Sequence, residues 1–320
     1  NILPSKKLTL VIDGKPHSTI HAASAASAAA SAPGGAAAPV APARAAAPRA
    51  AVAGQGSAPA SASAISQQYA QARAKALGQT PPPSAPASSS HSALQWSYAG
   101  EEAGPQAWAR LKPEYSQCAN GRRQSPIAID DADTLQGPAE ALQFHYVPSN
   151  ASVLNNGRSI EVEVQGDNTL TVRGTTYRLT QVQFHAPAEE QVNGTRAPMA
   201  AHLVHRSDDG QLAVLAVLLE FGAANALIDK VSTYMPLDSG DRVRMPPEWL
   251  NLADLLPTDQ RYYQFLGSLT TPPCTEGVLW MVLKTPVPLS ASQHRLFVQL
   301  YPHNARPLQA LNGRPVRSAQ

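Results

Sequence analysis

Two segments decide how this chain folds, Gln181-Val-Gln-Phe-His185 and Met199-Ala-Ala-His-Leu-Val-His205. Gln183 and His185 are two residues apart, so on a strand both side chains point to the same face. His202 comes from the next strand. A catalytic zinc needs three protein ligands and an open fourth position. The spacing therefore predicts that Gln183 and His185 share one face of the sheet, and imidazole suits zinc far better than the amide of Gln183 does.

The remainder of residues 94–320 is predicted to form one β-rich domain. Short β-like runs alternate with turn residues, as in Ser159-Ile-Glu-Val-Glu-Val164 followed by Gly166-Asp-Asn168. Leu212-Ala-Val-Leu-Ala-Val-Leu-Leu219 is a continuous apolar run of eight residues. Such a run is typical of a strand that is buried on both faces. We therefore predict a mostly β fold for this domain.

A long extension rich in Ala, Pro and Ser precedes the domain, over residues 1–93. Between residues 22 and 93 it has too little large apolar surface to offset its ordering entropy, so we expect an extended linker. Residues 7–14 predict a short strand that ends in an Asp-Gly turn, and residues 65–77 predict a helix. Neither can bury its apolar face alone. We therefore expect the extension to bind other protein subunits, by strand addition or helix docking.

The composition argues against several functions. The 320 residues carry a net charge of +2 and only 15% are charged, which does not indicate a basic face for nucleic acids. No apolar run reaches the length of about 18 residues that a transmembrane helix needs. The chain begins with Asn1-Ile-Leu-Pro4 and has no initial methionine, from which we expect a signal peptide that has been removed.

Further motifs in residues 94–320 connect the domain to a known family. They are Gln124-Ser-Pro-Ile127, Leu154-Asn-Asn-Gly157, Gly267-Ser-Leu-Thr-Thr-Pro-Pro273 and Asn304-Ala-Arg-Pro307. With the two segments above, they make the domain resemble an α-class carbonic anhydrase, in particular a carbonic-anhydrase-related protein with a degenerate zinc site. The resemblance implies a large twisted, mainly antiparallel sheet of about ten strands with a few short helices. It also implies a disulfide between Cys118 and Cys274, and hence a periplasmic or secreted location.

Three histidines bind the zinc in the family that the domain resembles. His185 and His202 stand at two of these positions, and Gln183 stands at the first. The family's glutamate two residues before the last ligand, which accepts that ring's other N–H, is replaced by Ala200. Loss of such a partner costs about 10–100-fold in metal affinity. We therefore expect zinc binding to be weak or absent.

Other positions of the resemblance concern catalysis and the substrate. Thr270 matches the threonine that orients the attacking oxygen, and Glu189 matches its buried carboxylate partner. Arg158 occupies the position of the proton-shuttle histidine, and arginine stays protonated, so it cannot relay a proton. The substrate pocket that the resemblance implies consists of Val204, Val214, Leu269, Thr271, Val278, Trp280, Gln181 and Asn156.

The residues leave three functions open. The departures from the family pattern favour a catalytically impaired domain that acts as a structural or partner-binding subunit of an extracytoplasmic assembly, tethered through its N-terminal extension. The alternative is a slow zinc-dependent carbonic anhydrase that hydrates CO2 to bicarbonate, with Gln183, His185 and His202 as ligands. A third possibility is a pocket converted to a small anion or a sugar, held by Arg158, Gln181 and Gln183.

Overall fold

The structure is a computed structural model that describes residues 9–12, 15–19, 95–138 and 140–319, and it divides into two units, residues 1–85 and 86–320. In the first unit, β1 (Thr9–Ile12) and β2 (Lys15–Thr19) pair antiparallel. β1 lies within the segment 7–14 where the sequence predicts a strand. The predicted turn at 13–14 and the predicted helix at 65–77 lie outside the described residues.

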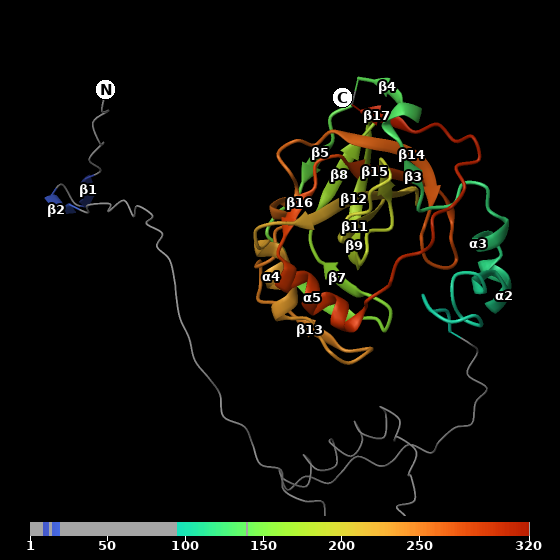
Figure 1. Ribbon diagram of the computed structural model, residues 1–320, viewed down its shortest axis with the longest axis horizontal. Helices are drawn as coiled ribbons and strands as arrows, with labels where there is room; N and C mark the ends of the chain where they lie inside the picture. The colour runs from blue at the N-terminus through green and yellow to red at the C-terminus, as the bar shows by residue number, and fades with distance from the viewer. Residues whose placement is uncertain (1–8, 13–14, 20–94, 139, 320) are drawn as a thin grey trace, which may run out of the picture. The chain divides into compact units, whose positions relative to one another are not determined.

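One large mixed sheet forms the second unit, which confirms the predicted mostly β fold (Figure 1). It has 13 strands, more than the ten or so implied by the resemblance, because short strands extend its ends and three more, β5, β8 and β16, pair beside the main path. The strands are β4 (Leu135–Gly137), β5 (Gln143–His145), β6 (Ala151–Asn155), β7 (Ile160–Val164), β8 (Thr169–Val172), β9 (Thr175–His185), β11 (Met199–Arg206), β12 (Leu212–Phe221), β13 (Arg242–Arg244), β14 (Tyr262–Ser268), β15 (Glu276–Leu283), β16 (Val287–Leu289) and β17 (Arg317–Ala319). A separate parallel pair joins β3 (Ala128–Ile129) to β10 (Gln191–Val192).

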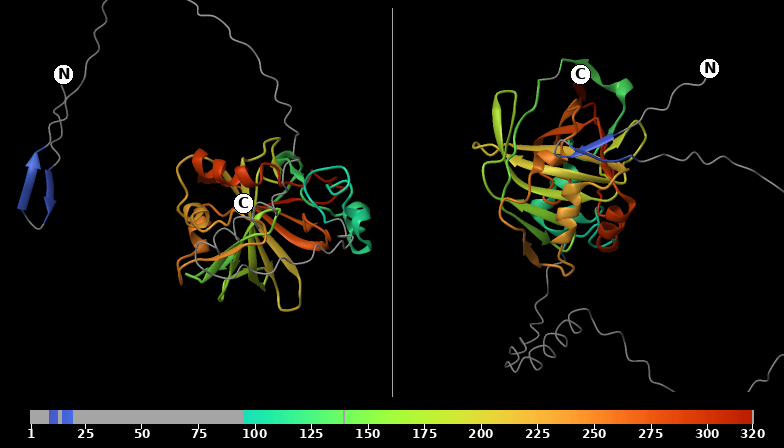
Figure 2. Two further views of the ribbon diagram at one scale, coloured as in Figure 1. Left: turned by 90° about the horizontal axis from the view of Figure 1, so that it is seen from below. Right: turned by 90° about the vertical axis from the view of Figure 1, so that its left-hand side faces the viewer.

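The strand order runs β13-β6-β7-β9-β11-β12-β15-β14-β17-β4, so the two segments singled out in the sequence are adjacent central strands. β9, β11 and β12 pair antiparallel, whereas β12 pairs parallel with β15 and β16, and β17 pairs parallel with β4. Figures 1 and 2 show β4 and β17 together near the C-terminus. The candidate metal ligands therefore come from the middle of the sheet, where the backbone is held on both sides.

Alternation along β12 explains why its apolar run is continuous. Ala213, Leu215, Val217 and Leu219 belong to the larger core cluster, and the intervening Val214, Ala216 and Leu218 belong to a second cluster. Successive side chains of a strand point to opposite faces, so each face contributes to a different core. The prediction of a strand buried on both faces is confirmed.

Short helices cover the larger core. Leu227, Ile228 and Val231 of α4 (Ala226–Thr233) and Phe297 of α5 (Ala291–Leu300) lie in that cluster, and Figure 1 shows the two helices side by side. Ser290 caps α5 through a reciprocal capping box with Gln293. The other helical turns are α2 (Trp108–Leu111), α3 (Gln117–Asn120) and the 3₁₀ turns Pro113–Tyr115, Asp131–Asp133 and Leu252–Leu255. In the described part of the chain no helix combines the length and apolarity that a bilayer crossing requires.

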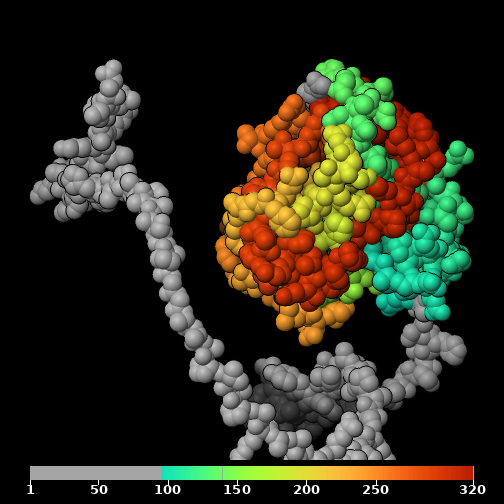
Figure 3. All heavy atoms as spheres, in the orientation of Figure 1, coloured from blue at the N-terminus to red at the C-terminus, as the bar shows by residue number. Residues whose placement is uncertain are grey.

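A segment shortly before the C-terminus packs against the first helical turns of this unit. Figure 3 shows the C-terminal residues in red next to the teal residues that follow position 95. The Cys118–Cys274 disulfide is present, as the resemblance implies. Arg306 is buried and donates to the carbonyls of Cys118 and Ser125 and to the Gln124 side chain. This guanidinium therefore ties the C-terminal segment to the residues that precede the sheet.

Candidate metal site

The register of β9 and β11 brings the two predicted histidine ligands together. His202 is directly opposite Gln183, and Ala200 is opposite His185. Both imidazoles are buried, and their ring centroids are 4.5 Å apart. Sequence spacing alone places Gln183 and His185 on one face, and the antiparallel pairing adds His202 to the same face.

His185 is held in one tautomer and one orientation by the C-terminal segment. Its Nδ1 lies 2.8 Å from the carbonyl oxygen of Asn304, which can only accept, so Nδ1 carries the proton. Its Nε2 is buried and has no hydrogen-bond partner among the described residues. Burial lowers the pKa of His185 to about 3, so the ring is neutral. An unpartnered, neutral imidazole nitrogen is the donor that a zinc ion needs.

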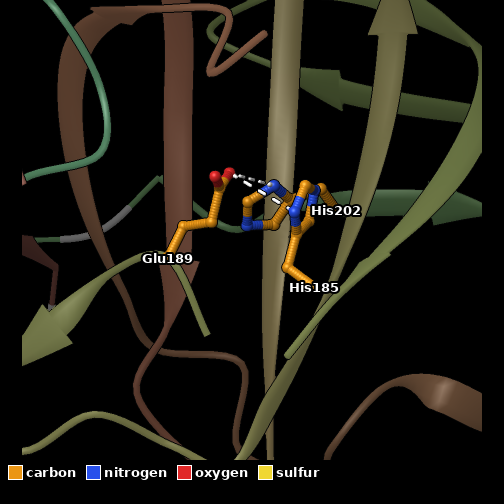
Figure 4. Close-up of side chains that lie close together, drawn as sticks. All are labelled: His185, Glu189 and His202. Carbon is orange, nitrogen blue, oxygen red and sulfur yellow. Dashed lines mark ion pairs between the residues drawn. The ribbon is translucent and has the colours of Figure 1, made fainter. Parts of the chain in front are cut away.

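Glu189 faces both imidazoles from the loop that follows β9. Its Oε2 lies 3.7 Å from His185 Nδ1 and 3.6 Å from His202 Nδ1, and Figure 4 shows the three side chains converging. Its Oε1 accepts the backbone N–H of Arg306 at 2.7 Å. Burial raises the pKa of Glu189 to about 7, although His202, Arg306 and the hydroxyl of Thr270 oppose that shift. Thr270 is thus in contact with Glu189, as the resemblance implies.

His202 has a carboxylate partner that the sequence analysis did not identify. Its Nε2 lies 3.1 Å from Oε2 of Glu190, which is itself buried. Burial lowers the pKa of His202, but the charges of Glu190 and Glu189 outweigh it and leave the pKa above its ordinary value. The expectation that Ala200 leaves this ring without a carboxylate is therefore corrected. A neighbouring loop supplies the carboxylate that β11 lacks.

The side of the site around Gln183 is more open and is differently bonded. The Nε2 of Gln183 donates to Oε2 of Glu161 on β7, at 3.4 Å. Burial raises the pKa of Glu161. Arg158, at the shuttle position, lies with its guanidinium carbon 4.3 Å from the ring centroid of Trp96. Gln183 and Arg158 are both partly exposed, whereas His185 and His202 are buried.

The apolar residues predicted for the substrate pocket gather beside the histidines. Val214, Val278 and Trp280 belong to one buried cluster, and Val204 and Leu269 pack against it. The ring of Trp280 stands edge-on to His202, with centroids 5.0 Å apart. The other predicted pocket residues are partly buried: Gln181, Thr271 and Asn156. Asn156 shapes the wall, because its side chain accepts the N–H of Arg158 and donates to Glu161.

Three residues of the site were missed by sequence reasoning, namely Glu190, Glu161 and Asn304. Glu190 follows Glu189 directly, so a pair of adjacent acidic residues next to a predicted ligand was the available signal. Glu161 is opposite Gln183 in the sheet, which only the strand pairing reveals. Asn304 contacts His185 through its backbone carbonyl, while its side chain bonds to the backbone of Phe184 and Ala186, so the residue type alone does not reveal the contact to the ring.

Comparisons with known proteins agree with this geometry. A family described as eukaryotic-type carbonic anhydrase matches residues 103–320. A carbonic anhydrase of Neisseria gonorrhoeae is 42% identical over 223 residues, which cover 69% of this chain and 86% of that protein. The α-carbonic anhydrase of Thermovibrio ammonificans, solved with the inhibitor sulfanilamide, is 40% identical with a TM-score of 0.66, covering 70% of this chain and 99% of that one.

Proposed function

Because the chain belongs to the eukaryotic-type carbonic anhydrase family, we propose that it catalyses the zinc-dependent, reversible hydration of carbon dioxide. One observation carries the proposal: the buried, neutral His185 has an unpartnered Nε2 beside His202 and Glu189. A buried nitrogen without a partner costs free energy, so a purely structural domain would have no reason to keep it. The sequence by itself leaned towards an impaired structural subunit, and the carbonic anhydrases among its relatives support the enzyme instead.

The donor set fits a zinc ion. His185 and His202 supply two imidazoles, and Gln183 is opposite His202 in the sheet and on the same face of β9 as His185. An amide that donates through Nε2 to Glu161 has its oxygen left to act as the third donor. Zinc held there supplies Lewis-acid activation of a water molecule.

The surrounding residues have the roles that this reaction requires. Glu189 accepts a hydrogen bond from Thr270, which fixes the direction of the Thr270 hydroxyl and so the orientation of an oxygen nucleophile beside it. The apolar cluster of Val214, Val278 and Trp280 offers a dry surface for carbon dioxide, which is apolar. Bicarbonate is charged, so contact with this apolar surface does not stabilise it. The product is therefore expected to leave the pocket for water.

Transfer of a proton out of the site is expected to limit the rate. Histidine can relay a proton near neutral pH, whereas the guanidinium of Arg158 cannot give one up. Arg158 is moreover stacked on Trp96, which holds it away from such a role. We therefore expect slow turnover that rises with the concentration of a small imidazole buffer.

Glu190 completes the proposal, as the positioning residue for His202. A carboxylate behind a ligating histidine orients the ring and strengthens it as a donor. With Glu190 at 3.1 Å from Nε2, Nδ1 of His202 is the atom that faces the metal position and Glu189. Zinc affinity should then be higher than the absence of a glutamate at position 200 implies. This removes one of the reasons for expecting zinc binding to be weak or absent.

The experiment that tests the function pairs zinc content with carbon dioxide hydration, both measured on the full chain purified without chelators. The proposal expects about one zinc per chain and measurable hydration, both lost in His185→Ala. Zinc binding without hydration at saturating zinc would overturn the proposal that the protein is an enzyme. Absence of both zinc and hydration would favour the alternative, a structural subunit. The carbonic anhydrase inhibitor sulfanilamide, bound in the relative from Thermovibrio ammonificans, serves as a second probe of the same site.

Two parts of the proposal concern the protein's surroundings. The Cys118–Cys274 disulfide supports an extracytoplasmic location, because such bonds persist in oxidising compartments. Binding of residues 1–93 to protein subunits is a separate proposal, and it rests on their sequence alone. Deletion of residues 1–90 tests it, since an unchanged set of co-purifying subunits would exclude tethering through this extension.

A further inference from the structure

A hollow of about 530 Å³ lies on the opposite face of the sheet from the histidines. It contains Leu266 of β14 and Leu279 of β15, and Leu279 belongs to the larger core cluster. Its neighbour Trp280, which contacts His202, points to the other face. A volume between about 300 and 1,000 Å³ is typical of small-molecule sites. The hollow thus has the size of a ligand pocket and is separate from the proposed catalytic site.

Five arginines line the hollow, and they come from three distant parts of the chain. They are Arg122, Arg123, Arg173, Arg314 and Arg317. Arg314 is a fixed part of the wall, because its buried guanidinium donates to the carbonyls of Gln124 and Leu266. Arg173 follows β8 and lies 3.7 Å from Glu140. These two arginines already have partners.

The other three arginines form no salt bridge in the described part of the chain. Arg122, Arg123 and Arg317 are exposed, and no carboxylate lies within 4 Å of their guanidinium groups in the described residues. Glu276 accepts the backbone N–H of Arg123 and the side chain of Gln124, and its charge offsets part of the charge of Arg123, which leaves Arg122 and Arg317 without a nearby carboxylate partner within the described ranges. Like charges gathered around a concave surface attract multivalent anions.

Gln264 is an independent sign of a missing ligand. It is on β14, between β15 and β17, it lines the hollow, and it is only 7% exposed. Its Nε2 has no hydrogen-bond partner among the described residues. Leaving a buried amide donor unpaired is costly, and most such groups in folded proteins are satisfied. A ligand oxygen in the hollow would supply the acceptor that this amide lacks.

Apolar surface accompanies the charge. Leu266 is 46% exposed in the lining of the hollow, and Pro315 and Leu279 line it as well. A bare inorganic ion would leave that surface in water, whereas a ligand with an apolar body would cover it. Planar guanidinium groups bind carboxylate and phosphate oxygens through paired hydrogen bonds.

We propose that this hollow binds a small organic anion that carries two or more oxyanion groups, carboxylate or phosphate, on an apolar body. The arginines at 122, 123 and 317 bind the oxyanions, Gln264 donates to one of their oxygens, and Leu266 contacts the apolar body. The site does not depend on the proposed carbonic anhydrase activity, because the two lie on opposite faces of the sheet.

The test is a calorimetric titration of the full chain with benzene-1,3,5-tricarboxylate and with benzene-1,3,5-trisphosphate, which carry the same number of oxyanion groups on the same apolar ring. We expect at least one of them to bind with about one molecule per chain, more weakly as salt is added. Whichever binds more tightly identifies the oxyanion. Inorganic phosphate should bind more weakly than either, and the neutral benzene-1,3,5-trimethanol should not bind. The proposal is overturned if neither anion binds, or if the neutral compound binds equally well.

Variants assign the binding to this hollow. The double variant Arg123→Gln/Arg317→Gln should lose about 100-fold in affinity, as expected for two charge-assisted hydrogen bonds. The matched control is Arg206→Gln/Arg295→Gln, which removes two exposed arginines outside the lining. Equal losses in the two variants would show a non-specific charge effect and overturn the site. The His185→Ala chain should bind the anion as the natural chain does.

Gln264→Leu separates the ligand role from a structural one. Without ligand the variant should melt at or above the temperature of the natural chain, since it removes an unpaired buried donor. With ligand its stabilisation should be several-fold smaller. A variant with a lower melting temperature and an unchanged affinity for the anion would show that Gln264 serves only the fold. Gln264 would then no longer support the proposed site.

Discussion

The inner half of the histidine site and its outer half differ in how they are held. The inner half, formed by His185, His202, Glu189 and Glu190, is buried and linked to β9, β11 and the C-terminal segment. The outer half, formed by Gln183, Glu161 and Arg158, is partly exposed. The departures from the family's ligand and shuttle residues lie in the outer half.

This difference indicates where the site tolerates change. A buried charge that loses its partner costs several kcal/mol, whereas a partly exposed side chain can turn to water. Loss of the glutamate at position 200 is accordingly offset by Glu190, at 3.1 Å from His202. Gln183 is partly exposed, and its amide already has a hydrogen-bond partner in Glu161, so this exchange leaves no buried polar group unpaired. If the inner half alone is sufficient for metal binding, changes to it should affect zinc retention far more than changes to the outer half.

The largest effect is expected from His202→Ala. Removing a buried imidazole from the donor set should abolish zinc retention, from about one ion per chain to none, in elemental analysis after dialysis. His145→Ala is the matched control, because His145 is exposed on β5. Zinc retained in full by His202→Ala would mean that the inner half is not the metal site.

Arg158→His tests the outer half. Placing a group that titrates near neutral pH at the shuttle position should raise the hydration rate by roughly 100-fold, a modest effect for an acid–base group. Stopped-flow hydration at low buffer concentration measures it, and added imidazole should accelerate the natural chain more than the variant. Equal rates in both chains would show that proton release does not limit turnover.

Glu190→Gln tests the replaced carboxylate. Zinc affinity, measured by competition with a chromophoric chelator, should fall by about 10–100-fold, because His202 loses its charged partner. Glu220→Gln, at an exposed position of β12, should leave it unchanged. The exchange Glu190→Ala/Ala200→Glu should recover most of the loss, and failure to recover any would show that Glu190 acts in another way.

The smallest effect is expected at the rim of the outer half. Arg242 on β13 lies 2.8 Å from Glu163 on β7, and their side chains are 54% and 35% exposed. Solvent screens such a pair, so Glu163→Gln should change the free energy of unfolding by less than about 1 kcal/mol. Urea denaturation measures the change. A larger loss would indicate that the outer half is as tightly coupled as the inner one.

Much of the fold followed from the sequence, because strand faces depend on a period of two. The run Leu212–Leu219 predicted a strand buried on both faces, and its side chains do alternate between two cores. The resemblance implied the disulfide, which is present. The positions of His185 and His202 on one face likewise follow from spacing and the neighbouring strand.

The sequence by itself determined which residues face the site, since alternation along a strand is local. Only the tertiary structure decided their partners: Glu190 for His202, Glu161 for Gln183 and the Asn304 carbonyl for His185. The same holds for the arginine-lined hollow, whose residues come from positions 122–123, 173, 264–266, 279, 312–315 and 317. These contacts join segments far apart in the chain, and their geometry is set by how loops and distant strands close around the sheet.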